Sequence, residues 1–197
     1  MENIVDDSYD LLIADCDSML YRACCACPEG SPESHALHNL KNIVDKMLDV
    51  VRPEAYVFYL SGDKNYRYDI ATIRPYKGNR KQPKPAWFNE TREYLMNMWG
   101  AEVTDGIEAD DACAIAQTEA LDNDQNSVIA SIDKDLLQVP GWNFNWVNNH
   151  FKHVSEFAGW CNFYHQMLVG DVTDNVVGVA GVGKKNAERI LQGATNK

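Results

Sequence analysis

Nine carboxylates in this sequence recur where an apolar run ends or a helix-forming run begins. The set contains no histidine or cysteine, and hard oxygen ligands alone favour Mg²⁺ or Mn²⁺ over zinc. Two such ions roughly 4 Å apart can activate water and stabilise the charge that develops on phosphorus during in-line displacement. We therefore predict a metal site for phosphoryl chemistry. The nine residues are Asp15, Asp63, Glu108, Asp110, Asp111, Asp133, Asp135, Asp171 and Asp174.

The densest acidic group precedes an alanine-rich run that favours a helix. If Glu108 begins that helix, Glu108 and Asp111 lie one turn apart on one face, with Asp110 beside them. The helix macrodipole stabilises one or two acids in a first turn, but three repel one another unless a cation lies between them. Asp171 and Asp174 have the same one-turn spacing, so the sequence predicts a second helical pair there.

Three apolar runs would position these acids. Residues 11–14 end at Asp15, residues 55–60 end just before a Gly-Asp pair, and residues 128–130 end shortly before Asp133. Each run is typical of a buried parallel strand. Between them, apolar residues recur every three or four positions from 37 to 51, which predicts a helix. Alternating strands and helices indicate an α/β sheet, whose ligands lie beyond the carboxyl ends of the strands. The alternative is that each Asp only caps the next helix.

Composition is that of an ordinary globular protein of 197 residues, with 45% hydrophobic and 24% charged residues. The net charge of -11 argues against a nucleic-acid partner, but residues 74–84 carry five bases and no acid. This stretch predicts a positive patch for phosphates, with a solvated loop as the alternative. No apolar run is long enough for a membrane helix, and the acidic N-terminus lacks a secretory h-region. We therefore expect a cytoplasmic protein with reduced cysteines.

The character of the sequence changes after about residue 155. Apolar residues from Phe157 to Leu168 predict one more helix, followed by a glycine-rich stretch and a short terminal helix. Glycines before a helix expose consecutive N–H groups that can hold a phosphate, and their carbonyls can bind a cation. We expect two regions, residues 1–154 and residues 155–197.

Taken together, these pieces resemble the 5′-nuclease family, which includes flap endonucleases, bacteriophage 5′-3′ exonucleases and the 5′-exonuclease domains of bacterial DNA polymerases. The resemblance covers roughly residues 10–192, and the short segment 64–100 makes the phage-type branch the most similar. The matching pieces are, in order, Asp15 after the first strand, Gly62-Asp63, Tyr76-Lys77-Gly78-Asn79-Arg80, Glu108-Ala109-Asp110-Asp111, Ser131-Ile132-Asp133-Lys134-Asp135-Leu136, and Gly170-Asp171 through Ala187.

The resemblance implies a PIN-like, mostly parallel sheet flanked by helices, a helical arch at about 70–100, and a helix-hairpin-helix variant over 155–197. It implies a structure-specific 5′-nuclease that hydrolyses DNA, or RNA in hybrids, at a 5′ end or 5′ flap by a two-metal-ion mechanism. The nine carboxylates would bind Mg²⁺ or Mn²⁺, and Lys77 and Arg80 would assist catalysis. The Gly181–Gly183 turn would bind K⁺, and the protein would act as a monomer. The residues implied to contact nucleic acid are Arg74, Tyr76, Lys77, Arg80, Lys81, Gly181, Val182, Gly183, Lys184 and Lys185.

Two other functions compete with this interpretation. Asp15-Cys16-Asp17 resembles the nucleophile loop of haloacid-dehalogenase-type phosphatases, in which Asp15 would be the nucleophile and Asp17 the general acid. The chain could also be a structure-specific DNA-binding module that has lost catalysis. The 5′-nuclease family usually has Gly directly after its first aspartate, where this sequence has Cys16-Asp17. Asp17 is therefore either an outer acid of the metal site or a helix cap.

Overall fold

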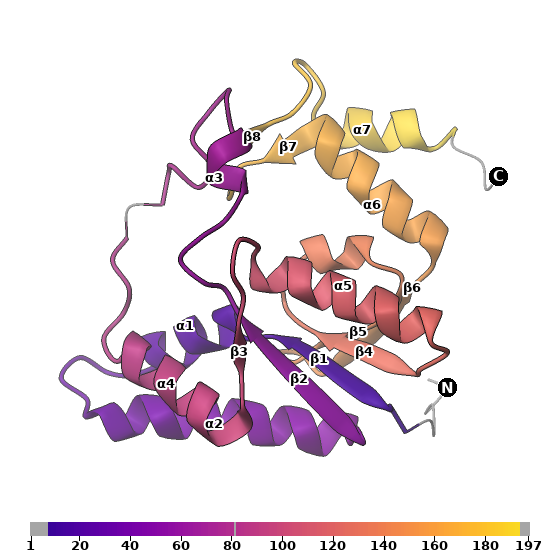
Figure 1. Cartoon of the computed structure of the whole chain (residues 1–197). Coiled ribbons are helices and arrows are strands. Elements are labelled where there is room, and N and C mark those ends of the chain that lie inside the picture. The colour runs from indigo at the N-terminus through magenta and orange to yellow at the C-terminus, as the bar shows by residue number, and fades with distance from the viewer. Residues whose placement is uncertain (1–7, 81, 194–197) are drawn as a thin grey trace.

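The computed structural model describes residues 8–80 and 82–193. A mostly parallel sheet of six strands lies at its centre, in the order β3-β2-β1-β4-β5-β6 (Figure 1). Within this sheet, β5 and β6 pair antiparallel and the other neighbouring strands pair parallel. The strands of this sheet are β1 (Leu11–Asp15), β2 (Ala55–Leu60), β3 (Glu102–Val103), β4 (Ser127–Ala130), β5 (Gly141–Asn145) and β6 (His150–Val154).

All three predicted strands are confirmed as neighbours in this sheet. In the register, Ala14 of β1 lies opposite Phe58 of β2 and Ala130 of β4. These three strands therefore end at one edge of the sheet, which is where acids that follow them can meet.

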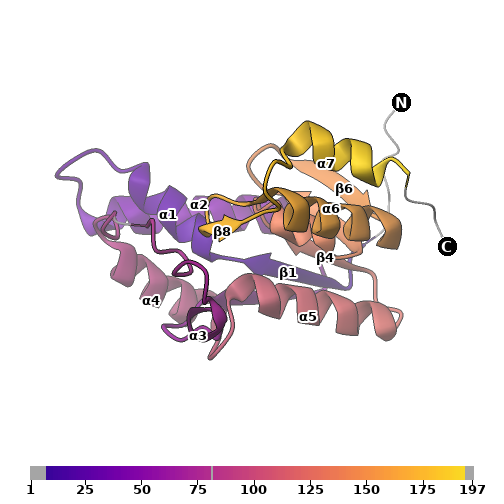
Figure 2. The same cartoon turned by 90° about the horizontal axis from the view of Figure 1, so that it is seen from above.

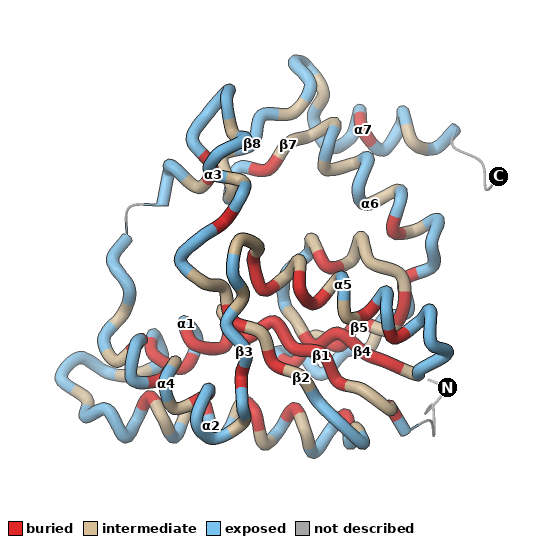
Figure 3. Tube along the Cα trace, viewed as in Figure 1, coloured by how far each residue is buried: buried red, intermediate tan, exposed pale blue. Residues whose placement is uncertain are grey.

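Helices cover both faces of the sheet, which makes a three-layer fold (Figures 1 and 3). Helices α1 (Asp17–Cys25), α2 (Glu33–Val51) and α4 (Phe88–Trp99) pack together on one face, and α5 (Ala109–Asp122) covers the other. Alternate β1 side chains serve the two faces: Leu12 packs with the first group, and Ile13 packs with Cys113 of α5. The sequence therefore folds with its apolar strands buried on both sides.

Helix α2 confirms the helix that the apolar spacing of residues 37–51 predicts. Its buried side chains include Leu40, Val44 and Met47, which lie on the face turned toward the sheet. The helix ends at Val51, and Arg52 takes a left-handed conformation with φ of 50°. A proline follows at position 53, where it cannot continue a helix.

Helix α5 begins one residue later than the sequence predicted. Glu108 is the N-cap residue with extended backbone, and Ala109 is the first helical residue. The Glu108 N–H donates to the Asp111 carboxylate at 3.1 Å, which is half of a capping box. Glu108 and Asp111 remain neighbours, but through the cap rather than by sharing a helical face.

The predicted helical arch at 70–100 is wrong in its first half. After the short helix α3 (Arg67–Ile70), the described residues 71–80 and 82–87 form turns and extended chain without a helix. Pro75, Pro83 and Pro85 remove backbone donors that a helix needs. In the second half, α4 packs on α1 and α2 and so belongs to the core. We call residues 67–80 the strap.

The C-terminal region contains both predicted helices, α6 (Glu156–Val169) and α7 (Lys184–Leu191), which lie side by side (Figure 2). Between them is a small hairpin of β7 (Gly170–Asp171) and β8 (Val176–Val177), so the predicted helical turn at Asp171 and Asp174 is wrong. Gly170 has φ of 78°, and a Cβ there would lie 2.3 Å from the Gly178 nitrogen. This close approach favours the hairpin over a helix. The helix-hairpin-helix assignment and the two-region division stay predictions.

Helix α6 joins this region to the core by packing on the 3-10 helix η1 (Asp135–Gln138). In the described part of the chain, no helix is both long and apolar enough to span a membrane.

Candidate functional site

Asp15 is the last residue of β1 and lies buried at the carboxyl edge of the sheet. Its carboxylate accepts hydrogen bonds from the Asp17 N–H and the Ser131 hydroxyl, both at 3.2 Å. Burial, and then the charges of Asp17 and Asp110, raise the pKa of Asp15 to about 7. Asp15 and Asp110 therefore repel each other across this edge.

Asp110 and Asp133 are in the same electrostatic situation. Burial, and then the charges of Asp111 and Glu108, raise the pKa of Asp110 to about 6. The pKa of Asp133 is raised by burial, and its carboxylate accepts the Asp135 N–H at 2.9 Å. Within residues 8–80 and 82–193, none of Asp15, Asp110 and Asp133 forms an ion pair with a basic side chain. Asp15 is buried, Asp110 half-buried and Asp133 exposed. Uncompensated carboxylate oxygens of this kind fit a divalent cation.

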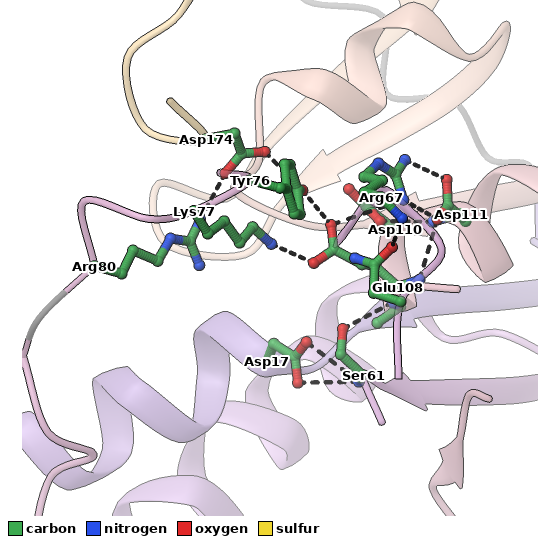
Figure 4. A network of polar contacts seen from close by, with 12 residues as sticks. Asp17, Ser61, Arg67, Tyr76, Lys77, Arg80, Glu108, Asp110, Asp111 and Asp174 are labelled. Carbon is green, nitrogen blue, oxygen red and sulfur yellow. Dashed lines mark hydrogen bonds and ion pairs between the residues drawn. The ribbon is translucent and has the colours of Figure 1, made fainter. Parts of the chain in front are cut away.

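Glu108 and Asp111 instead bind basic side chains of the strap (Figure 4). Arg67 donates to both oxygens of Asp111, at 2.5 and 2.7 Å, and Lys77 donates to Glu108. Burial opposes ionisation of both acids, but these hydrogen bonds outweigh it and lower the pKa of Glu108 and of Asp111. The Tyr76 hydroxyl donates to Glu108 at 2.6 Å.

The strap is also fixed to the turn between β7 and β8. Arg80 donates to the Asp174 carboxylate at 2.8 Å, and the Lys77 N–H donates to the Asp174 carbonyl at 3.0 Å. The Asn79 amide donates to the Val172 carbonyl at 2.7 Å. The strap therefore bridges the start of α5 and the β7–β8 hairpin.

Asp171 and Asp135 form a third group. Lys134 donates to both carboxylates, at 2.5 Å to Asp171 and 3.1 Å to Asp135. Gln166 of α6 also donates to both, each time at 2.9 Å. Burial raises the pKa of Asp171, but the bonds from Lys134 and Gln166 dominate and bring it to about 2.

These groups meet at a cleft of about 530 Å³ between α5, η1, α6 and the strap. Its polar lining includes five of the nine predicted acids, and its apolar lining includes Leu136, Phe163 and Met167. The five acids are Asp110, Asp111, Asp135, Asp171 and Asp174. Among the residues that the structure describes, no three His, Cys, Asp or Glu side chains converge as a metal-binding group, since several acids turn toward basic side chains instead.

Asp63 is not brought into this arrangement. It is exposed after β2, and no hydrogen bond or ion pair joins it to the other eight acids in the described structure. Its role as a metal ligand stays a prediction.

The predicted nucleic-acid contacts fall into two groups. In the strap, Arg74 is exposed and lines a smaller cleft of about 190 Å³, while Tyr76, Lys77 and Arg80 bind acids. Lys81 lies outside the described residues. The second group surrounds the start of α7, where all but the half-buried Val182 are exposed. That group comprises Gly181, Val182, Gly183, Lys184 and Lys185.

Sequence reasoning missed Arg67, Lys134 and Gln166 as site residues. Arg67 precedes the basic stretch by several positions, and Gln166 carries no charge, so no local pattern distinguishes either one. Lys134 stands between two predicted acids, and that position was the available signal.

Asp17 is the first residue of α1, and both of its carboxylate oxygens accept the Ser61 N–H at 3.2 Å. These bonds join the loop after β2 to the start of α1.

The mostly parallel sheet flanked by helices on both faces matches the PIN-like fold of solved 5′-nucleases. Among solved structures, the T5 5′-exonuclease with bound zinc matches with a TM-score of 0.73 at 16% identity, covering 92% of this chain and 74% of that one. The catalytic core of Rad2 in complex with DNA substrate matches with a TM-score of 0.60 at 15% identity, covering 94% and 61%. At these identities, the likeness establishes the fold.

The family model of the 5′-3′ exonuclease N-terminal resolvase-like domain matches residues 10–162, so the chain belongs to the 5′-3′ exonuclease family. It is 30% identical to DNA polymerase I of Caldicellulosiruptor bescii over 92% of this chain, and 28% identical to the 5′-3′ exonuclease of Mycoplasmopsis pulmonis over 74%. The chain spans 24% of the first relative's length and 53% of the second's. This membership decides against the haloacid-dehalogenase interpretation.

Proposed function

We propose that this chain is a structure-specific 5′-nuclease that hydrolyses DNA phosphodiesters at a 5′ end or 5′ flap, with RNA in hybrids as a further substrate. The observation that carries the proposal is the cleft where acids from α5, η1 and the β7–β8 hairpin meet the basic strap. Acids suit the cations of phosphoryl transfer, and bases suit the phosphates of a nucleic acid. Membership of the 5′-3′ exonuclease family supports this assignment.

Asp15, Asp110 and Asp133 would hold divalent cations, Mg²⁺ above all, because in the described structure their carboxylates have no basic partner to neutralise them. The cations would supply Lewis-acid chemistry at phosphorus when bound. Lys77 and Arg80 would orient the scissile strand through its phosphates, and Tyr76 would fix Glu108. The turn at Gly181–Gly183 would grip the duplex backbone and bind K⁺ through its carbonyls. We further propose that the enzyme acts as a monomer in the cytoplasm of a bacterial or phage-infected cell.

Cleavage should require a divalent cation. With Mg²⁺, 5′-flap and duplex substrates should yield products with a 5′-phosphate and a 3′-hydroxyl. EDTA should abolish turnover because the unpaired acids then lose the cation that neutralises them. Gel analysis with end-group mapping measures both outcomes, with single-stranded DNA as the comparison substrate. Undiminished cleavage in EDTA would contradict the proposal. DNA binding without cleavage in Mg²⁺ would favour the inactive binding module.

Lys77 should contact a phosphate in the complex with DNA. If it makes one contact, Lys77→Ala should lower the salt slope of binding by about one and weaken all sequences alike. The measurement is DNA affinity from 50 to 200 mM salt with Ca²⁺ present. Lys41→Ala on α2 is the matched control and should leave the slope unchanged. An unchanged slope in Lys77→Ala would mean that this lysine stays paired with Glu108.

A further inference from the structure

We propose that the strap is an internal latch: Arg67 and Lys77 neutralise the acids at the start of α5 in the cation-free protein and leave when divalent cations bind there. The released strap then presents both side chains to phosphates. The inference rests on the proposed function, since it assumes that these acids bind cations. It adds a coupling between the cation site and the nucleic-acid site.

The ion pairs of the latch are more than surface contacts. The Arg67 guanidinium donates one hydrogen bond to each oxygen of Asp111, and its Nη1 lies 3.9 Å from Glu108 Oε2. Side chains of the Lys77–Glu108 pair are only 17% and 11% exposed. Such charge-assisted bonds hold the carboxylates in a fixed orientation. Figure 4 shows both basic side chains pointing toward the acids at the start of α5.

Apolar packing on the strap is sparse. Ile70 is 64% exposed and Ile73 is 86% exposed, so neither side chain anchors the strap to the core. Tyr76 is buried, and its hydroxyl bonds to Glu108 at the start of α5 and to Asp174 in the β7–β8 turn. A segment fixed mainly by polar contacts opens at low free-energy cost. When the contacts to α5 are lost, only the bonds to the β7–β8 turn still hold the end of the strap.

Electrostatic repulsion makes the closed latch and the cation-bound site mutually exclusive. The positive charge of Arg67 also acts on Asp110, which lies beside Asp111, and opposes the rise in the pKa of Asp110. A divalent cation on Asp110 and Asp111 would compete with Arg67 for the same oxygens and repel both basic side chains. Because displacement frees two phosphate-binding groups, cation binding and DNA binding should each strengthen the other, as linkage requires.

Hydrogen exchange of the full chain tests the latch without any activity measurement. Ca²⁺, compared with Na⁺ at equal ionic strength, should speed exchange of the Lys77 amide, which donates to the Asp174 carbonyl. Trypsin should also cut faster after Lys77 and Arg80, while peptides from α2 stay unchanged. Titration calorimetry with Ca²⁺ measures cation binding separately. Cation binding with unchanged or increased strap protection would overturn the latch and leave the nuclease proposal standing. No cation binding would overturn both.

A variant separates the latch from a general charge effect. Arg67→Gln should raise Ca²⁺ affinity on the order of tenfold, because the competing cation is gone. Its strap should exchange fast without Ca²⁺ and respond little when Ca²⁺ is added. Arg52→Gln, after α2 at the opposite edge of the sheet, is the matched control and should behave as wild type. A strap in Arg67→Gln that keeps wild-type protection and its Ca²⁺ response would refute the latch even if the affinity rises.

Discussion

Replacing Asp110 by Asn should reduce single-turnover cleavage of a 5′-flap substrate by at least about 10³-fold. Asp110 lies beside Asp111 at the start of α5 and lines the cleft. Its carboxylate has no ion-pair partner in the described structure, so the substitution removes charge that only a cation would compensate. The amide keeps the shape of the side chain but is a weaker cation ligand. Cleavage rates at saturating Mg²⁺ measure the effect.

The matched control is Asp122→Asn, the same change at the far end of the same helix. Asp122 is exposed there, and its substitution should leave cleavage within about twofold of wild type, as most surface changes away from a site do. Without divalent cations, DNA binding by Asp110→Asn should stay equal or become tighter, because repulsion of phosphates falls. Near-normal cleavage by Asp110→Asn would exclude this carboxylate from the cation site.

Phe58→Ala should lower the free energy of unfolding by about 3–5 kcal/mol. Phe58 lies in β2 between β3 and β1, is 1% exposed, and packs in the cluster beneath α1, α2 and α4. The truncation leaves a cavity that the packed neighbours can fill only in part. Because domains are typically stable by about 5–15 kcal/mol, the variant should lose a large share of its stability. Urea unfolding followed by circular dichroism gives the difference.

Phe157→Ala is the control for this prediction, because Phe157 is partly exposed on α6. The same truncation there should cost less than half as much, with a similar dependence on urea. Equal losses for the two variants would show that burial in the sheet does not govern the stability of this fold.

The sequence was sufficient to predict three neighbouring strands of the sheet and the edge at which they end. Strands β1, β2 and β4 are short apolar runs that end at an acid or a few residues before one, and α2 has clear helical spacing. Both patterns are local, because each depends on neighbouring residues. The family resemblance rested on motifs in a fixed order, and the family match over residues 10–162 confirms it. Two expectations were wrong where backbone geometry overrode them. The family resemblance implied a helical arch, but prolines prevent a helix between α3 and α4. The spacing of Asp171 and Asp174 predicted a helical turn, but close backbone approach at Gly170 favours a hairpin there.

The partners of the acids were decided only by the tertiary structure. Arg67 and Asp111 are far apart in the sequence, and so are Arg80 and Asp174, yet both pairs are within hydrogen-bond distance. From the sequence alone, we expected the acids to repel one another unless a cation lay between them. Folding brings side-chain cations to Glu108, Asp111, Asp171 and Asp174, and leaves Asp110 without one. The reason is physical: residue types determine which charges exist, but Coulomb energies depend on distance and burial, which the packed chain alone sets.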